Sequence, residues 1–409
     1  MKNKKQISLR VAFFFSLNLL TIVAAHSQNT WSQKTSIPTY GRVAPVSFSI
    51  GNKGYVATGW LAATYGQDLW EFDPSANTYT QMASLQGPGR YGGAAFSIGT
   101  KGYVSTGYNN TVFYNDLWEW DQATNTWSQK SNFGGAARYG AIAFSIGTKG
   151  YVGTGADKTT EYKDFWEWDQ VNDTWTQKSP FGGAARSTAV GFSIGATGYV
   201  GTGLGSTICL GDFWAWDQAT DTWSQKANFL GSARGGAAGF SIGDKGYIGT
   251  GGDGMNILTD FFEYDTTANG WVIRTDFGGM PRSSATGFSC AGKGYIGNGA
   301  DASFTGKSSD LWEYTPLNYV TGDISTKLNA NKISVKTLPG NRIYIEGNGD
   351  IQNVSLTLFD LRGRAIFSKD LQGDNANVIS IPSNSNEVYL YRISQSTNTI
   401  LTGKLMLTK

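Results

Sequence analysis

The chain has 409 residues, more than one ordinary core requires and enough for two domains. Its 33 basic and 31 acidic residues give a net charge of +2, so neither nucleic acid nor an anionic membrane is expected as a partner. Aromatic residues account for 14% of the chain and Gly for 54 positions, which favours an all-β fold of short strands and tight turns.

Residues 1–27 have the pattern of a secretory signal peptide. A basic start precedes an apolar run over 11–25, and a small-x-small cleavage site ends at Ser27. A membrane anchor is the alternative, but a bilayer core of about 30 Å needs about 20 apolar residues and this run is shorter. Cleavage would remove four basic residues and no acidic one, so that +2 becomes −2 and no transmembrane anchor is expected in the mature chain. It would also remove His26, the only histidine.

A 48-residue repeat organises residues 28–320. The motif Asp116-Leu-Trp-Glu-Trp-Asp121 returns every 48 residues, and after 50 at the last step. A Gly-Tyr pair keeps the same period, with its tyrosines at Tyr55, Tyr103, Tyr151, Tyr199, Tyr247 and Tyr295. A third series places aromatic residues at Trp31, Tyr79, Trp127, Trp175, Trp223 and Trp271. Because independent series share one period, the region is a repeat architecture.

One repeat predicts four short antiparallel strands. They span 90–98, 103–107, 116–120 and 126–130, and a Gly-Thr-Lys-Gly hairpin turn joins the first two. Six such units, repeated radially, predict a six-bladed β-propeller over residues 28–320. The strand around Trp31 has no blade before it, and the last blade has only a weak fourth strand at 318–320. We therefore expect Trp31 to lie in the sixth blade and to close the ring.

The repeat resembles the kelch family, in which a glycine pair after the second strand precedes a spaced Tyr and Trp. The residues that carry this resemblance are Val152-Gly-Thr-Gly, Phe165-Trp-Glu-Trp-Asp and Thr174-Trp-Thr-Gln-Lys. The chain departs from the family by using Gly-x-Gly for most of the glycine pairs. The resemblance extends to the central domain of galactose oxidase, and it implies the propeller fold more strongly than any activity, because this fold hosts both binders and enzymes.

After a polar linker over 321–331, residues 332–409 lose Trp and show short alternating runs, which predicts a small C-terminal β-sandwich. Leu358-Phe-Asp-Leu-Arg-Gly-Arg, Val388-Tyr-Leu-Tyr-Arg-Ile and the ending Thr402-Gly-Lys-Leu-Met-Leu-Thr-Lys409 resemble the C-terminal sorting domain of Bacteroidetes proteins exported by the type IX system. Leu338-Pro-Gly-Asn replaces the Pro-Asn-Pro common in that family, and Glu387 replaces a Gly, so a generic sandwich is the alternative. The resemblance implies that 332–409 bind the type IX export machinery, and that the protein is secreted or held at the outer cell surface.

In such a propeller, the loops between second and third strands emerge on one face together with the crossings between blades. We call this the variable face, because these loops carry most of the sequence variation. In blades one to three they bring aromatic residues, namely Trp60, Tyr65, Tyr108, Phe113, Tyr114 and Tyr162. These predict a stacking surface for sugar rings, with Asn109, Asn110 and Asp157 as polar rims. The alternative is that the rings fold onto their own loops. Blades four to six bring the apolar Leu204, Ile208, Met255 and Phe304 instead.

Six arginines enter the innermost strands from the same face, at Arg42, Arg90, Arg138, Arg186, Arg234 and Arg282. They predict either an anion-binding ring at the channel mouth or structural pairing with the aspartates that begin the third strands, at Asp68, Asp116, Asp164, Asp212, Asp260 and Asp310. On the opposite face, the hairpin lysines are interpreted as solvated turns, at Lys53, Lys101, Lys149, Lys245 and Lys293. Trp118, Trp166 and Trp214 are interpreted as core.

Catalytic motifs are scarce. The kelch family includes copper-radical oxidases, which need histidine ligands and a Tyr–Cys cofactor, and a chain without its first 27 residues has no histidine. The same absence disfavours Ser-His-Asp catalysis and typical zinc sites, so no metal or cofactor is expected. The carboxylates Asp157, Glu161, Asp253 and Asp301 would permit glycoside chemistry only if two of them met. Cys290 stands at a core position, and a disulfide with Cys209 is not expected from their spacing.

These observations lead to three hypotheses on function. The first is a secreted or surface-held propeller that binds a glycan or a protein through the variable face, without catalysis. The second is an enzyme acting on a sugar acid, by resemblance to kelch-type sialate mutarotases, with the arginines holding a carboxylate. The third is a structural surface protein without a discrete ligand.

Overall fold

The computed structural model describes residues 29–303 and 306–316, together with seven strands between 333 and 407. The chain divides into two compact units, Met1–Pro316 and Leu317–Lys409, which we describe separately. The predicted signal peptide, the weak strand at 318–320 and the linker over 321–331 lie outside the described residues. All regular elements in the described part are strands.

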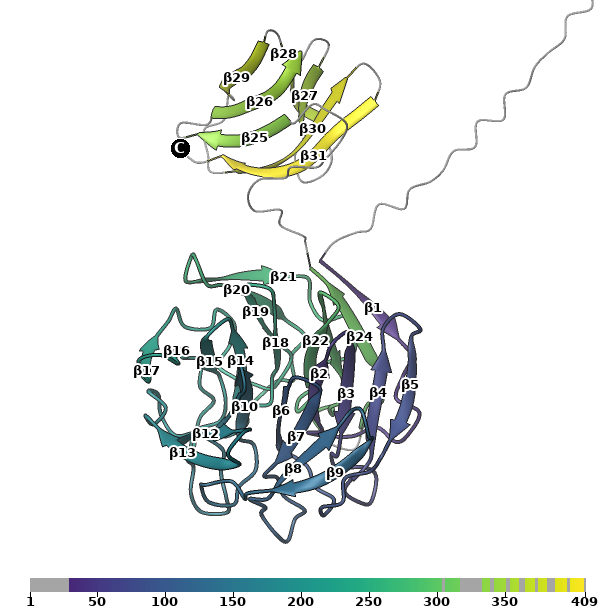
Figure 1. Cartoon of the computed structure of the whole chain (residues 1–409), viewed down its shortest axis with the longest axis vertical. Coiled ribbons are helices and arrows are strands. Elements are labelled where there is room, and N and C mark those ends of the chain that lie inside the picture. The colour runs from purple at the N-terminus through teal and green to yellow at the C-terminus, as the bar shows by residue number, and fades with distance from the viewer. Residues whose placement is uncertain are drawn as a thin grey trace, which may run out of the picture. The chain divides into compact units, whose positions relative to one another are not determined.

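The first unit is a six-bladed β-propeller, in which six four-stranded antiparallel sheets surround one axis (Figure 1). Blade one contains β2 (Val46–Ile50), β3 (Lys53–Ala57), β4 (Leu69–Asp73) and β5 (Thr78–Met82). Blade two contains β6 (Ala94–Ile98), β7 (Lys101–Ser105), β8 (Leu117–Asp121) and β9 (Thr126–Lys130). Blade three contains β10 (Ile142–Ile146), β11 (Lys149–Gly153), β12 (Phe165–Asp169) and β13 (Thr174–Lys178).

The remaining blades follow the same plan until the last. Blade four contains β14 (Val190–Ile194), β15 (Thr197–Gly201), β16 (Phe213–Asp217) and β17 (Thr222–Gln225). Blade five contains β18 (Ala238–Ile242), β19 (Lys245–Gly249), β20 (Phe261–Asp265) and β21 (Gly270–Arg274). Blade six contains β22 (Thr286–Cys290), β23 (Lys293–Gly297), β24 (Leu311–Thr315) and, from the start of the chain, β1 (Thr30–Lys34).

The ring closes through β1, as the sequence predicts. β1 pairs antiparallel with β24, and Trp31 lies opposite Tyr314. The two outermost edges of the repeat are thereby paired with each other instead of being left open to another chain. The Trp31 ring also packs against Phe261 and Phe277, with centroids 5.0 and 5.1 Å away.

A second closure lies at the start of the innermost strands, where one residue per blade has a left-handed backbone. Its N–H donates to the carbonyl of the same residue in the preceding blade, at 2.7–3.0 Å. The six residues are Ala44, Gly92, Gly140, Thr188, Gly236 and Ser284. Because Ala44 in turn donates to Ser284, the hydrogen bonds form a closed ring around the axis. This ring holds the blades together where the variable-face crossings enter the channel.

The core lies between neighbouring blades and explains the Gly-Tyr motif. The β2 sequence buries Val46, Phe48 and Ile50 on one side, the alternation expected of a strand. The Phe48 ring stacks on Tyr55 at 5.1 Å and also covers Gly102 of the next blade. A Cβ at Gly102 would come within 2.2 Å of that ring, so only Gly fits before the tyrosine.

The cysteines follow the sequence interpretation, and the tryptophans follow it only in part. The fully buried tryptophans are Trp120, Trp168 and Trp216. Trp118, Trp166 and Trp214, which the sequence analysis assigns to the core, are half-buried at its edge, because each indole N–H donates to the aspartate two residues earlier. Cys290 is buried in the core as expected, and both cysteines are free.

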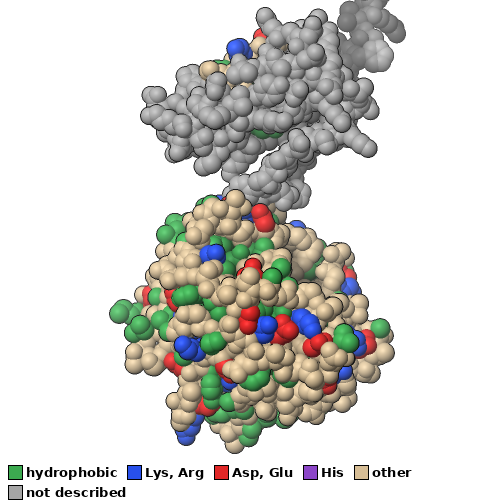
Figure 2. Space-filling model, turned by 60° about the vertical axis from the view of Figure 1, so that its left-hand side comes forward, with side chains coloured by type: hydrophobic (Ala, Val, Ile, Leu, Met, Phe, Trp, Pro, Cys, Tyr) green, Lys and Arg blue, Asp and Glu red, His purple; other side chains and the backbone are tan. Residues whose placement is uncertain are grey.

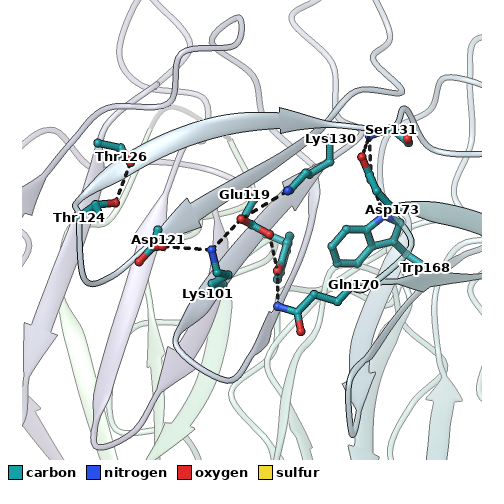
Figure 3. Close-up of polar contacts among 11 residues, drawn as sticks. Lys101, Glu119, Asp121, Thr124, Thr126, Lys130, Ser131, Trp168, Gln170 and Asp173 are labelled. Carbon is teal, nitrogen blue, oxygen red and sulfur yellow. Dashed lines mark hydrogen bonds and ion pairs between the residues drawn. The ribbon is translucent and has the colours of Figure 1, made fainter.

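The hairpin lysines are not simply solvated, which corrects the sequence interpretation. Lys101 donates to Glu119 at 2.9 Å and to Asp121 at 3.0 Å (Figure 3). The second oxygen of Glu119 accepts from buried Tyr103 at 2.7 Å, and Gln170 of the next blade donates to that tyrosine at 2.8 Å. Glu119 in the third strand thus binds both Lys101 and Tyr103, and Gln170 links blades two and three. Lys53 and Lys293 pair with the equivalent glutamates, and Lys149 and Lys245 with aspartates.

The second unit is also built from strands. A three-stranded sheet contains β25 (Ile333–Leu338), β26 (Arg342–Asp350) and β29 (Asp374–Ser380). A four-stranded sheet contains β28 (Ala365–Leu371), β27 (Val354–Phe359), β30 (Glu387–Gln395) and β31 (Asn398–Leu407). Ile343 and Ile345 of one sheet and Leu356 and Leu358 of the other are buried. That the two sheets form a sandwich remains a prediction.

Candidate functional site

The variable face repeats one small pattern in every blade. The residue after each arginine pairs with the third residue of the loop that follows the second strand, which in turn pairs with a residue further along that loop. Each blade therefore presents three neighbouring positions near the axis. In blade one they are Val43, Trp60 and Tyr65, and in blade two Tyr91, Tyr108 and Phe113. In blade three they are Tyr139, Ala156 and Glu161.

Six of these positions form one continuous set of rings, which we call the aromatic row; it consists of Trp60, Tyr65, Tyr91, Tyr108, Phe113 and Tyr139. Tyr91 links the first two blades, with centroids 6.1 Å from Trp60 and 5.8 Å from Tyr65. Tyr108 lies 5.8 Å from Tyr91 and stacks on Phe113 at 4.1 Å. Tyr139 lies 6.2 Å from Tyr108 and 6.0 Å from Phe113. All six side chains are half-buried.

Tyr91 and Tyr139 are absent from the sequence-predicted set, although they connect the row. Both directly follow a repeat arginine, at positions that carry Val43, Ser187, Gly235 or Ser283 in other blades. An aromatic residue at two of six equivalent positions was the signal that could have identified them. The alternation with Trp60, Tyr65 and Tyr108 comes from the cross-loop pairing, which sequence spacing alone does not reveal.

The other two predicted tyrosines behave differently. Tyr114 lies under the guanidinium of Arg90 at 4.5 Å and accepts from Asn109, and Tyr162 lies under Arg138 at 3.9 Å and donates to Asp157. Both rings therefore fold back onto their own loops, the alternative that the sequence analysis left open. Asn109 and Asp157 of the predicted polar rim likewise form hydrogen bonds within their own loops. Asn110 instead accepts a hydrogen bond from Tyr91 of the row at 2.8 Å.

The six arginines are buried, and each forms a two-pronged pair with the aspartate of its own blade. The Nη2–Oδ2 distances are 2.7–2.9 Å, and Nη1 also donates to the carbonyl of the residue after the second strand. The exposed fraction of each arginine is 0–2%. This confirms the predicted Arg–Asp pairing. A role of the arginines in holding an anion stays a prediction, and in this structure the guanidiniums do not reach the surface.

The aspartate partners titrate accordingly. Burial alone would raise the pKa of Asp212, but the hydrogen bonds from Arg186 and Trp214 outweigh it, and the pKa is lowered. The same balance lowers the pKa of Asp310 beside Arg282. Asp212 and Asp310 are therefore ionised over the physiological pH range, and their pairs hold together the strand end, the loop and the crossing.

The candidate carboxylates of the variable face separate into two kinds. Asp157, Asp253 and Asp301 each accept a hydrogen bond from a backbone N–H two or three positions further along the chain, and they thereby shape their own loops. The Tyr162 hydroxyl is the main cause that lowers the pKa of Asp157 to about 2. Glu161 has no such partner among the described residues, and burial raises the pKa of its carboxyl. Asp157 and Glu161 share the loop of blade three, whereas Asp253 and Asp301 lie in the loops of blades five and six.

A lysine contacts the end of the aromatic row at which Trp60 lies. Lys307 of blade six lies over the Trp60 ring of blade one, with Nζ 3.8 Å from the centroid, and donates to the Leu61 carbonyl. Burial lowers the pKa of this lysine. The charge of Lys307 therefore interacts with the Trp60 ring and helps to hold that ring in place.

Blades four and five carry a hollow at the positions that the aromatic row occupies in the first three blades. A cavity of about 350 Å³ is lined by Leu204, Cys209 and Ile257, because the equivalent positions Gly235 and Gly252 carry no side chain. Ile208 and Met255 are 63% and 94% exposed beside it, and Phe304 lies outside the described residues. The hollow around the propeller axis is smaller, about 140 Å³, and is lined by small residues such as Ala95, Ala143 and Gly191.

Charged side chains of the propeller lie in small mixed groups on the described part of the face shown in Figure 2. Within the described residues, no cluster of acidic, Cys or His side chains has the arrangement of a metal site. In the same part of the chain, there is no helix of the length and apolar character needed to cross a bilayer.

The first unit is an all-β propeller, and the second matches a known family. Residues 339–408 match the family described as "Secretion system C-terminal sorting domain", which indicates export through the type IX system to the cell surface or the medium. A solved structure described as "Structure of YjhT" is similar to this chain, with a TM-score of 0.58 and 14% identity over 68% of this chain and 96% of that one. At this identity the likeness shows the fold alone. No curated protein matches the sequence.

Proposed function

We propose that this protein is a kelch-type propeller that is exported to the cell surface or the medium and binds a glycan through the aromatic row. The continuous contact of six rings across three blades is the observation that carries the proposal. Elsewhere in the described part of the propeller, the equivalent positions of blades four to six carry small or aliphatic side chains and Lys307.

Sugar rings expose flat C–H faces that pack on aromatic rings, and hydroxyl groups that need hydrogen-bond partners. The row offers both, because Tyr91, Tyr108 and Tyr139 combine a ring with a phenolic hydroxyl. The rings are already ordered by contact with one another, and Lys307 and Asn110 hold Trp60 and Tyr91. A surface that is ordered before binding loses little side-chain entropy when the ligand arrives.

The two ends of the chain support the location of this activity. We infer that residues 1–27 are a signal peptide for the first membrane and that residues 332–409, which include the matched segment, direct the second step. A propeller delivered outside the cell in this way meets polysaccharides and glycoproteins, the ligands that the aromatic row fits.

A glycan array with the purified protein tests the proposal, followed by titration of the best ligand. We expect Tyr108→Ala to weaken binding about tenfold, because it removes the central ring of the row, in a variant that remains folded at the temperature of the assay. Tyr40→Ala is the control, because Tyr40 is 70% exposed and outside the row. Equal loss in both variants, or full binding by Tyr108→Ala, would refute the proposed surface.

A protein ligand is the second candidate. It is favoured by the exposed apolar side chains around the hollow of blades four and five, Ile208 and Met255 among them. If the array is negative, binding to a surface protein that is lost in Met255→Ser and kept in Tyr108→Ala would support this reading instead.

A further inference from the structure

The aromatic row ends at a carboxylate. Tyr139 pairs with Ala156, and Ala156 pairs with Glu161, so Tyr139 and Glu161 flank a small side chain where blades one and two carry Trp60 and Tyr108. The charge of Glu161 is close enough to Tyr139 to contribute, after burial, to raising the pKa of that phenol. The rings of Tyr108 and Phe113 stand 6.2 and 6.0 Å from the Tyr139 ring. Three aromatic rings and one carboxylate therefore meet at this end.

Glu161 differs from Asp157, Asp253, Asp301 and Lys307 of the variable face, because no contact among the described residues uses its charge. The carboxylates at Asp157, Asp253 and Asp301 bind their own loops, and Lys307 is held by Trp60 and Leu61. Among the described residues, Glu161 makes no ion pair, although the exposed Lys158 and Lys163 lie in the same loop. A half-buried carboxylate without a partner is unfavourable for the fold and is expected where a ligand supplies the missing charge.

We propose that Tyr108, Phe113, Tyr139 and Glu161 form a subsite for a cationic group, and that the glycan bound by the row carries a protonated amine, as an amino sugar does. This rests on the proposed glycan function. Aromatic faces attract cations through their quadrupole, and a carboxylate adds a charge-assisted hydrogen bond from an ammonium group.

The test uses the purified protein and two tetrasaccharides with the same backbone, the β-1,4-linked tetramer of glucosamine, whose amines can be protonated, and its fully N-acetylated, neutral counterpart. We expect the wild type to bind the charged tetramer about tenfold more tightly at low salt, with a preference that shrinks as salt rises. Glu161→Gln should abolish this preference and leave binding of the neutral tetramer unchanged. Asp244→Asn, which removes one charge from the exposed hairpin of blade five, should keep the preference.

Each outcome has a defined meaning. A preference that persists in Glu161→Gln, or no preference in the wild type, would overturn the cationic subsite, while binding of the neutral tetramer would still support the aromatic row. No binding of either tetramer would overturn the amino-sugar proposal and would count against the glycan function itself. Tyr139→Leu provides an independent check, because it removes one ring and keeps the carboxylate, and it should lower affinity for the charged tetramer more than for the neutral one.

Discussion

Trp31 lies directly opposite Tyr314, on the first and last strands of the propeller, with ring centroids 5.1 Å apart. The indole N–H donates to the Thr275 carbonyl of blade five at 3.1 Å. One residue near the start of the chain therefore joins the sixth blade to the fifth. The variable face and its aromatic row depend on this closure, because the row takes residues from three blades that must keep a fixed spacing.

We predict that Trp31→Ala destabilises the propeller by about 2–4 kcal/mol, the loss expected when a large, partly buried aromatic side chain is removed. Chemical denaturation monitored by tryptophan fluorescence measures this free energy of unfolding. Tyr40→Ala, which removes an exposed ring close by in the sequence, should change it by less than about 0.5 kcal/mol. Similar values for both variants would show that β1 does not hold the ring closed.

Arg138→Ala should destabilise the fold by about 3–5 kcal/mol, because it leaves the partly buried Asp164 carboxylate without its partner. The double variant with Asp164→Ala should be less destabilised than the sum of the single changes. A variant Arg138→Ala that folds with normal stability and loses only ligand binding would instead support the anion-binding role of the arginines.

Gln170→Leu should cost about 1–2 kcal/mol of stability, because the buried Tyr103 hydroxyl loses the donor that links blades two and three (Figure 3). The matched control is Gln129→Leu. Gln129 is exposed and makes only a long contact of 3.4 Å with Asn132, so its replacement should be nearly neutral. Differential scanning calorimetry of the two variants measures the difference, and equal midpoints would argue against the interblade link.

Stability and binding should respond in opposite directions at Glu161. Since burial raises the pKa of this carboxyl, the folded state binds the proton more tightly than the unfolded state. The group therefore lowers stability at pH values above its folded pKa, and this loss disappears as the pH falls below its ordinary value of about 4.3. We expect Glu161→Gln to raise the unfolding midpoint slightly at pH 7 and not at pH 3. A lower midpoint at pH 7 would reveal a stabilising contact of the carboxylate.

The sequence predicts the architecture well because the same strand and turn motifs recur in six repeats. The period of Arg42, Asp68 and their equivalents fixes the blade count and the ion pairs, and the unpaired strand at Trp31 predicts the closure. The lysine contacts were missed because Glu119 reads as part of an alternating strand motif, and only the register places it beside Lys101 and Tyr103. For the same reason, spacing could not separate Glu161 from Asp157, which caps its own loop.

The most direct test of the account is a crystal structure of the protein with the best ligand from the glycan array. We predict a sugar ring packed on Tyr108 or Tyr91, with further rings following the row toward Trp60 or Glu161. A sugar bound on the hairpin face, or in the hollow of blades four and five with the aromatic row empty, would contradict the proposed function.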